Sequence, residues 1–318
     1  MRMFTASLAL LLSVVVAKTI ESAELPALPE GNTGIAAQHP GDAGIDKDPK
    51  VVWTDNFENG TCNADHVFGG ITCTKEKENV HGGLFALEMR ILRPSNDKST
   101  SLGFHNTLKE PQALLFLRYY AKFGKDTELF HGGTHDGGSI FARAPGVPIA
   151  KPGIKADGKN EYSVSIDTWR SEEEKTQSPG PLALYVYHPE QRHQWGEHFF
   201  ASGRLLPYTD KPASDFFGKE FKAIPDFIPE RDKWYCYELM VKANTPGQRD
   251  GRVAFWVDGK LSGDFPNLRL RDVETLKANI VSLALYTQNE KITKACEMWF
   301  DDVVVAKEYI GPMVAGKK

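Results

Sequence analysis

Two histidines and an aspartate in a glycine-rich stretch are the residues best suited to acid–base chemistry. His131, His135 and Asp136 lie among four glycines within residues 131–138. Glycine lets the backbone approach a ligand closely, and histidine titrates near neutral pH, so His131 or His135 could act as a general base. The same three side chains could instead hold a divalent metal ion, or the stretch could be a turn with solvated histidines.

Tyrosines and cations also share single faces of predicted strands. Alternation over residues 182–188 places Tyr185 and Tyr187 on one face, as proton donors or as ordinary sheet aromatics. Residues 114–123 group Arg118, Tyr120 and Lys122 in the same way. Since a buried face would not hold two cations together, this face is predicted to be a solvated surface or a groove for an acidic ligand.

The elements that position these residues are predicted to be short strands. Order is expected to begin with a strand over residues 51–58, and almost no helix or internal repeat is visible. Further strands are predicted at residues 114–123, 182–188, 235–242, 252–257, 279–287 and 298–306. This pattern indicates an all-β fold with two antiparallel sheets. The aromatic stretch 201–231 is predicted to be a functional loop.

The ends of the chain have a different character. Residues 1–23 have a charged start, a short apolar core and small residues before Ala23, and they are predicted to be a cleaved signal peptide. The protein is therefore expected to be secreted or periplasmic. Residues 24–50 are predicted to be a flexible leader, residues 51–312 a single β domain and residues 313–318 a tail.

The composition limits the possible partners. A net charge of −4 over 318 residues does not favour nucleic-acid binding, and no later apolar run reaches the ~20 residues of a membrane span. A monomer is expected. In an exported protein, the four cysteines predict disulfides, with Cys62–Cys73 and Cys236–Cys296 as the favoured pairs and four buried thiols as the alternative.

Several segments together resemble a known family. The strand Tyr185-Val-Tyr187-His-Pro189-Glu-Gln191 is followed by an Asn-Thr-Pro-Gly turn at residues 244–247 and by Val-Asp-Gly-Lys at residues 257–260. With residues 162–170 before them, these segments resemble polysaccharide lyase family 14 and its alginate- and glucuronan-lyase relatives. The resemblance covers roughly residues 110–310.

The resemblance implies a concanavalin-like β-jelly roll whose concave cleft binds a uronic-acid polymer and cleaves it by β-elimination. Tyr185 and Tyr187 match the paired tyrosines of the family, and one of them would be the acid. Other residues are expected to bind the acidic polysaccharide. They are Arg118, Tyr120, Lys122, Ser165, Arg170 and Gln191.

The catalytic lysine of the family is missing. The matching place reads Glu128-Leu-Phe-His131, and no arginine follows Ser163 or Ser165 in the way the family pattern requires. His131 or His135 is therefore expected to replace the lysine as base. The alternative is a carbohydrate-binding jelly roll that has lost catalysis.

Carboxylates elsewhere suggest two further possibilities. Glu58 and Asp302 fall near the first and last strands, where jelly rolls often hold a structural Ca²⁺. No cofactor is otherwise expected. Glu238 with Asp167 is the one pair that could serve a glycoside hydrolase, which needs two facing carboxylates.

Overall fold

The computed structural model describes residues 25–92, 99–129, 134–148, 153–170, 176–204, 216–288 and 294–316. The predicted signal peptide and His131 lie outside these ranges. Within them, no helix is long and apolar enough to cross a membrane.

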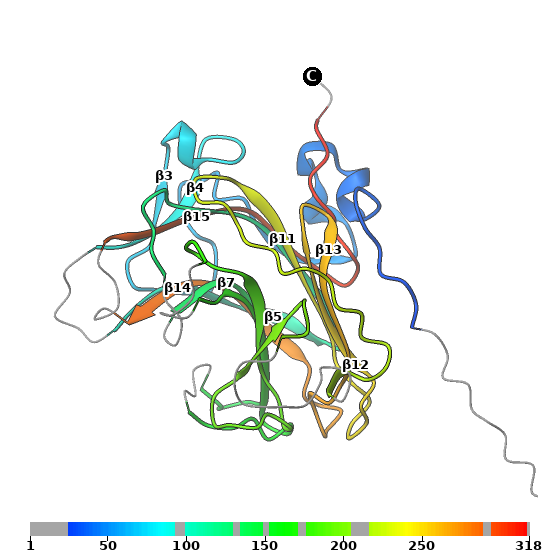
Figure 1. Cartoon of the computed structure of the whole chain (residues 1–318). Helices are drawn as coiled ribbons and strands as arrows, with labels where there is room; N and C mark the ends of the chain where they lie inside the picture. Colours follow the sequence, from blue (N-terminus) through cyan, green and yellow to red (C-terminus); the bar gives the residue numbers. More distant parts are fainter. Residues whose placement is uncertain are drawn as a thin grey trace, which may run out of the picture.

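Two antiparallel sheets face each other (Figure 1). Sheet A has the order β13-β12-β11-β6-β15-β4-β3, with β1 also paired to β15. Its strands are β1 (Val51–Asp55), β3 (Thr72–Thr74), β4 (Ala86–Ile91), β6 (Leu114–Phe123), β11 (Tyr235–Lys242), β12 (Gly251–Val257), β13 (Lys260–Leu268) and β15 (Cys296–Ala306). The all-β jelly roll predicted from the sequence is confirmed.

Sheet B has the order β10-β9-β8-β7-β14-β5-β2. Its strands are β2 (His66–Phe68), β5 (Ser99–Gln112), β7 (Thr134–Arg143), β8 (Glu161–Thr168), β9 (Leu182–Tyr187), β10 (Glu197–Phe200) and β14 (Ala278–Gln288). One 3₁₀ turn, η4 (Lys77–Asn79), lies between β3 and β4.

The main core lies between the sheets and is built by alternate residues of each strand. Leu117 and Tyr119 of β6 point into it from sheet A, while Val164 and Ile166 of β8 point into it from sheet B. Because strand side chains alternate, the residues between these must point outward. The outer face of each sheet is thus determined by the same pattern that builds the core.

Residues 25–50 are an ordered strap over the outer face of sheet A, so the prediction of a flexible leader is wrong (Figure 1). The strap contains η1 (Ile35–Gln38), η2 (Pro40–Asp42) and η3 (Ile45–Lys47). Trp256 Nε1 donates to the carbonyl of Pro29 at 2.8 Å, and the amide of Ala36 donates to Ile310 O at 2.9 Å. The composition misled because part of the attachment uses backbone groups of the strap, which an amino-acid composition does not reveal.

The strap also covers an apolar layer of its own. Ile35 and Ile45 are buried against Phe116, Trp256 and Tyr309, which project from the outer side of sheet A and the segment after it. Burying such side chains contributes about 1.5–3 kcal/mol each. The strap is consequently an integral part of the fold.

All four cysteines are free thiols, so the predicted disulfides are not confirmed. Strand β6 separates Cys236 on β11 from Cys296 on β15, and of these two residues Cys296 alone belongs to the main core. Two strand spacings amount to about 9–10 Å, which is too far for an S–S bond between these strands.

Candidate active site

Strands β8 and β9 place polar side chains on the outer face of sheet B. Ser165 lies opposite Tyr185 and Ser163 lies opposite Tyr187 in the β8–β9 register. Because directly opposed residues share a face, the serines and tyrosines form one surface, and the alternate residues fill the core. Asp167 continues the same outward set on β8.

The two tyrosines are linked through their hydroxyls. Tyr185 Oη donates to Tyr187 Oη at 3.3 Å and accepts a hydrogen bond from the amide of Gly196 at 3.1 Å. Burial, together with the neighbouring Tyr187, raises the pKa of Tyr185 above its ordinary value. Tyr185 therefore keeps its proton, and Tyr187, which accepts that bond, can direct its own proton toward a ligand.

Gly196 is needed at this place. A Cβ atom there would lie 2.9 Å from the rings of both tyrosines. The loop before β10 can reach Tyr185 Oη with its amide only because no side chain intervenes. A buried hydrogen bond between His188 Nε2 and Glu197 Oε2, 2.8 Å long, holds this loop in place.

A His–Asp dyad lies beside the tyrosines. His135 Nδ1 is 2.7 Å from Asp167 Oδ2, and the ring centres of His135 and Tyr185 are 5.1 Å apart. The His135 side chain is 43% exposed, whereas that of Asp167 is 2% exposed. Burial lowers the pKa of His135, but the ion pair with Asp167 raises it by more, so the net shift is upward.

Asp136 points to the other side of β7. It accepts a hydrogen bond from the amide of Thr168 at 2.6 Å and another from the Thr168 hydroxyl, beneath the sheet surface. Burial and the nearby charge of Asp167 raise its pKa well above the usual range. The metal site proposed from His131, His135 and Asp136 loses its carboxylate ligand, because Asp136 and His135 lie on opposite faces. His131 lies outside the described residues.

Other donors complete the surface. Ser139 Oγ donates to Ser165 Oγ at 2.7 Å, which leaves the Ser165 hydroxyl hydrogen for another acceptor. The His198 ring lies 4.7 Å from that of Tyr185. Sequence reasoning missed Ser139 and His198, although both follow the outward alternation of their strands.

The predicted groove of Arg118, Tyr120 and Lys122 does not exist, and this expectation is corrected. These side chains lie on the outer face of sheet A, with exposed fractions of 0%, 7% and 2%. The His81 ring stacks on Tyr120, and Lys122 Nζ donates to the carbonyl of Glu78 and to Asp232. Arg118 forms an ion pair with Asp42 of the strap. The cations share a face, as alternation indicated, because covering residues supply their partners.

Gln191 and Arg170 make contacts within the protein. Gln191 is fully buried, and its amide group donates to the carbonyls of His193 and Trp195, each at 2.9 Å. The prediction that Gln191 binds substrate is therefore wrong. Arg170 lies just beyond the C-terminal end of β8, and its Nη1 atom donates to the carbonyl of Thr176 at 3.2 Å.

Glu58 and Asp302 brace one turn, residues 81–85. Glu58 accepts hydrogen bonds from the amides of Leu84 and Phe85, and Asp302 bonds to His81 Nδ1 at 2.8 Å. In the described ranges, no three His, Cys, Asp or Glu side chains form a metal-binding group. The carboxylates expected to hold Ca²⁺ thus have peptide and imidazole partners.

The carboxylate pair of a hydrolase is also absent from this arrangement. Glu238 is buried on the outer side of sheet A, where it accepts the amides of Ile310 and Gly311 at 2.8 Å each. Asp167 belongs to the outer face of sheet B. The two carboxylates cannot flank one glycosidic bond.

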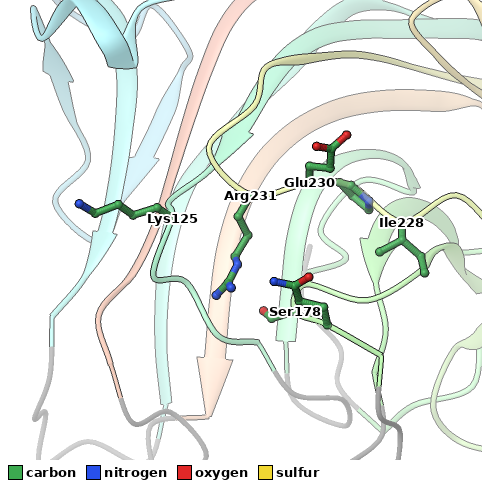
Figure 2. A pocket seen from close by; sticks show the side chains of 7 residues that line it. Lys125, Ser178, Ile228, Glu230 and Arg231 are labelled. Carbon is green, nitrogen blue, oxygen red and sulfur yellow. The ribbon is translucent and has the colours of Figure 1, made fainter.

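A separate pocket has a volume of about 350 Å³. Figure 2 shows the side chains that line it. The Thr127 carbonyl links two of the lining residues, because it accepts hydrogen bonds from Ser178 Oγ at 3.0 Å and from Arg231 Nη1 at 3.2 Å. Its lining residues are Lys125, Gln177, Ser178, Ile228, Pro229, Glu230 and Arg231. None of the dyad or tyrosine residues contributes to it.

Comparison with solved structures assigns the architecture. Alginate lyase Aly36B is 15% identical, with 83% of this chain and 99% of that chain aligned at a TM-score of 0.51. The fold is that of the alginate lyases. The marine PL-14 alginate lyase from Aplysia kurodai (15% identity, 80% and 98% coverage) and alginate lyase vAL-1 from Chlorella virus (16%, 81% and 100%) both give a TM-score of 0.54.

The comparison confirms the predicted resemblance at the level of the fold. No family model and no curated protein matches the chain. The arrangement of Tyr185 and Tyr187 beside the His135–Asp167 dyad is therefore argued from the geometry of this protein.

Proposed function

We propose that this protein is an exported polysaccharide lyase that cleaves a uronic-acid polymer by β-elimination. The observation that carries the proposal is the His135–Asp167 dyad beside the hydrogen-bonded pair Tyr185–Tyr187. Elimination needs a base for the proton at C5 and an acid for the leaving glycosidic oxygen. The outer face of sheet B offers both within one cluster of rings.

His135 is the proposed base. Asp167 accepts the Nδ1–H bond, so the neutral ring carries its proton on Nδ1 and its lone pair on Nε2. Nε2 removes the C5 proton, and the electron pair of that C–H bond forms the C4–C5 double bond. The buried carboxylate then stabilises the imidazolium, as it does in other His–Asp dyads.

Tyr187 is the proposed acid. The bond from C4 to the glycosidic oxygen breaks as the double bond forms, and the oxygen takes a proton from Tyr187 Oη. Tyr185 donates to Tyr187 Oη and so stabilises the tyrosinate. Proton transfer from His135 to the tyrosinate then restores both groups.

The uronate carboxylate must be stabilised while C5 loses its proton. Ser165 is the proposed hydrogen-bond donor, because its hydroxyl accepts from Ser139 and keeps its own hydrogen for the substrate. Arg170, which follows β8, is the cation proposed to bind a carboxylate of the polymer. Solved alginate-lyase neighbours support a polysaccharide ligand, since an Aly36B mutant was determined with an alginate tetrasaccharide.

One assay separates the candidate functions. Purified protein is incubated with alginate, polyglucuronate or pectate, and the ultraviolet absorbance of unsaturated uronide is followed. A rise that disappears in His135→Ala is the expected result. New reducing ends without that absorbance would mean hydrolysis and would overturn the proposal.

A second candidate is a carbohydrate-binding protein without catalysis. It is favoured by Glu128, which stands where the resemblance places a lysine. Retention on polysaccharide without cleavage of any polymer would support this function. Export is tested separately, by measuring the mass of the secreted protein. Cleavage after Ala23 predicts a mature chain that begins at Glu24.

A further inference from the structure

The outer face of sheet B carries one in-register row across all seven strands. Each residue lies directly opposite the next in the strand pairing, so all of them share one face. The row runs His198, Tyr185, Ser165, Ser139, Ser282, His105, His66. Strands lie about 4.8 Å apart, so the row extends to roughly 29 Å. The proposed catalytic cluster occupies only one end of it.

The other end is an aromatic cluster. His105 lies with its ring centre 4.8 Å from Phe68 and 6.0 Å from His66, and the His66 and His105 planes differ by 11°. Phe141 closes the cluster edge-on to His105 at 6.0 Å. His66 is exposed, and the other three rings are half-buried. We call these four residues the distal cluster.

A glycine lets the Phe68 ring lie against the sheet. Gly103, opposite Phe68, has φ +153°, and a Cβ there would lie 3.0 Å from Phe68 Cζ and 2.3 Å from the Leu283 carbonyl oxygen. Any side chain at Gly103 would displace the ring. The backbone is thus shaped to present a flat aromatic surface on this face.

The distal cluster has an unused polar atom as well. His105 Nδ1 is buried and has no hydrogen-bond partner among the described residues. Burial, with the nearby His66 and Arg143, lowers the pKa of His105 to about 4 against the opposing effect of Asp65. The ring is therefore neutral at physiological pH, and it suits stacking and hydrogen bonding to a hydroxyl better than ion pairing.

We propose that the distal cluster is a sugar-binding subsite, which holds a remote residue of the polysaccharide whose cleavage site lies at Tyr185 and Tyr187. The pyranose ring would stack on Phe68 and on the exposed His66, with the half-buried His105 ring beside them. Between the two ends, the Ser165 hydroxyl keeps a hydrogen for a ligand, because Ser139 donates to Ser165 and Ser282 donates to the Phe104 carbonyl. This inference rests on the proposed function for the identity of the polymer.

Chain length provides the test. Phe68→Ala and His66→Ala are compared with wild type on alginate or polyglucuronate polymers and on their trisaccharides. The KM for polymer should rise about tenfold, whereas values for trisaccharides, which cannot span the row, should be unchanged. Equal losses on both substrates, or no loss on either, would overturn the subsite.

Binding is measured independently of turnover by electrophoresis in gels cast with the same polymers. The background variant is Tyr187→Phe, and Leu84→Ala, with an exposed side chain on another surface, is the matched control. The polymer should slow the migration of Tyr187→Phe and of Tyr187→Phe with Leu84→Ala. Adding His66→Ala to Tyr187→Phe should abolish this retardation. If no polymer is cleaved but this pattern holds, the lyase proposal fails and the subsite stands. If neither polymer retards the protein, the subsite is wrong.

Discussion

The Nδ1 atom of His135 lies 2.7 Å from the Oδ2 atom of Asp167, and the two residues come from adjacent strands of sheet B. The carboxylate is buried while the imidazole is 43% exposed, so the negative charge is held inside and part of the ring is open to a ligand. This bond determines both the tautomer and the pKa direction of His135. It is the basis for the first prediction.

Replacing Asp167 by Asn should lower kcat about 10²- to 10⁴-fold, because the amide can favour the wrong imidazole tautomer. Asp167 raises the pKa of His135, and a base works above its pKa. The acid limb of the pH profile should therefore move to lower pH in Asp167→Asn. Asp250→Asn, on a turn of sheet A, should change neither quantity. An unmoved limb would remove Asp167 from this role.

Tyr187→Phe should lower kcat about 10²- to 10⁴-fold with little change in KM, because it removes the proton donor and keeps the ring. Tyr185→Phe should lower kcat less than Tyr187→Phe does. Tyr185 acts through Tyr187, because it donates a hydrogen bond to Tyr187 Oη and accepts one from the Gly196 amide. Steady-state kinetics on the preferred polymer measure both variants. Full activity in Tyr187→Phe would exclude it as the acid.

Asp42→Ala should destabilise the fold by about 3–5 kcal/mol, because it leaves the fully buried Arg118 guanidinium without its carboxylate. Urea unfolding measures the change. Glu308→Ala breaks the exposed pair with Lys50 at 2.5 Å and should cost less than about 1 kcal/mol. Similar losses in the two variants would show that the strap does not hold Arg118 as described.

Stability should fall as pH rises through the titration of Glu238. Burial raises its pKa to about 7 from the ordinary 4.5, despite opposing bonds from two amides and the charge of Arg118. The folded state therefore binds the proton more tightly than the unfolded state, and this contribution is complete below about pH 4.5 and lost as pH passes 7. Glu238→Gln should flatten the dependence of unfolding free energy on pH between these values. An unchanged slope would contradict the assignment.

Alternation alone predicted much of the site. Period-two patterning places Tyr185 with Tyr187, and it places Ser163 with Ser165, whatever the rest of the fold does. The same argument correctly grouped Arg118 and Lys122 on one face. It failed on their function, because a strand pattern does not say what covers its outer side. For Arg118 the answer lay in residues 25–50, whose composition suggested no structure. For Lys122 it lay in Glu78 and Asp232, which are far from it in the sequence.

The sequence by itself determined the fold class, the faces of the strands and the pairing of the tyrosines, because these follow from local geometry. Only the tertiary structure decided that Asp167 meets His135, since the register of β7 and β8 brings together residues 32 positions apart. It also decided that the polar row crosses all seven strands of sheet B. Register and coverage depend on long-range packing, which a local pattern cannot encode.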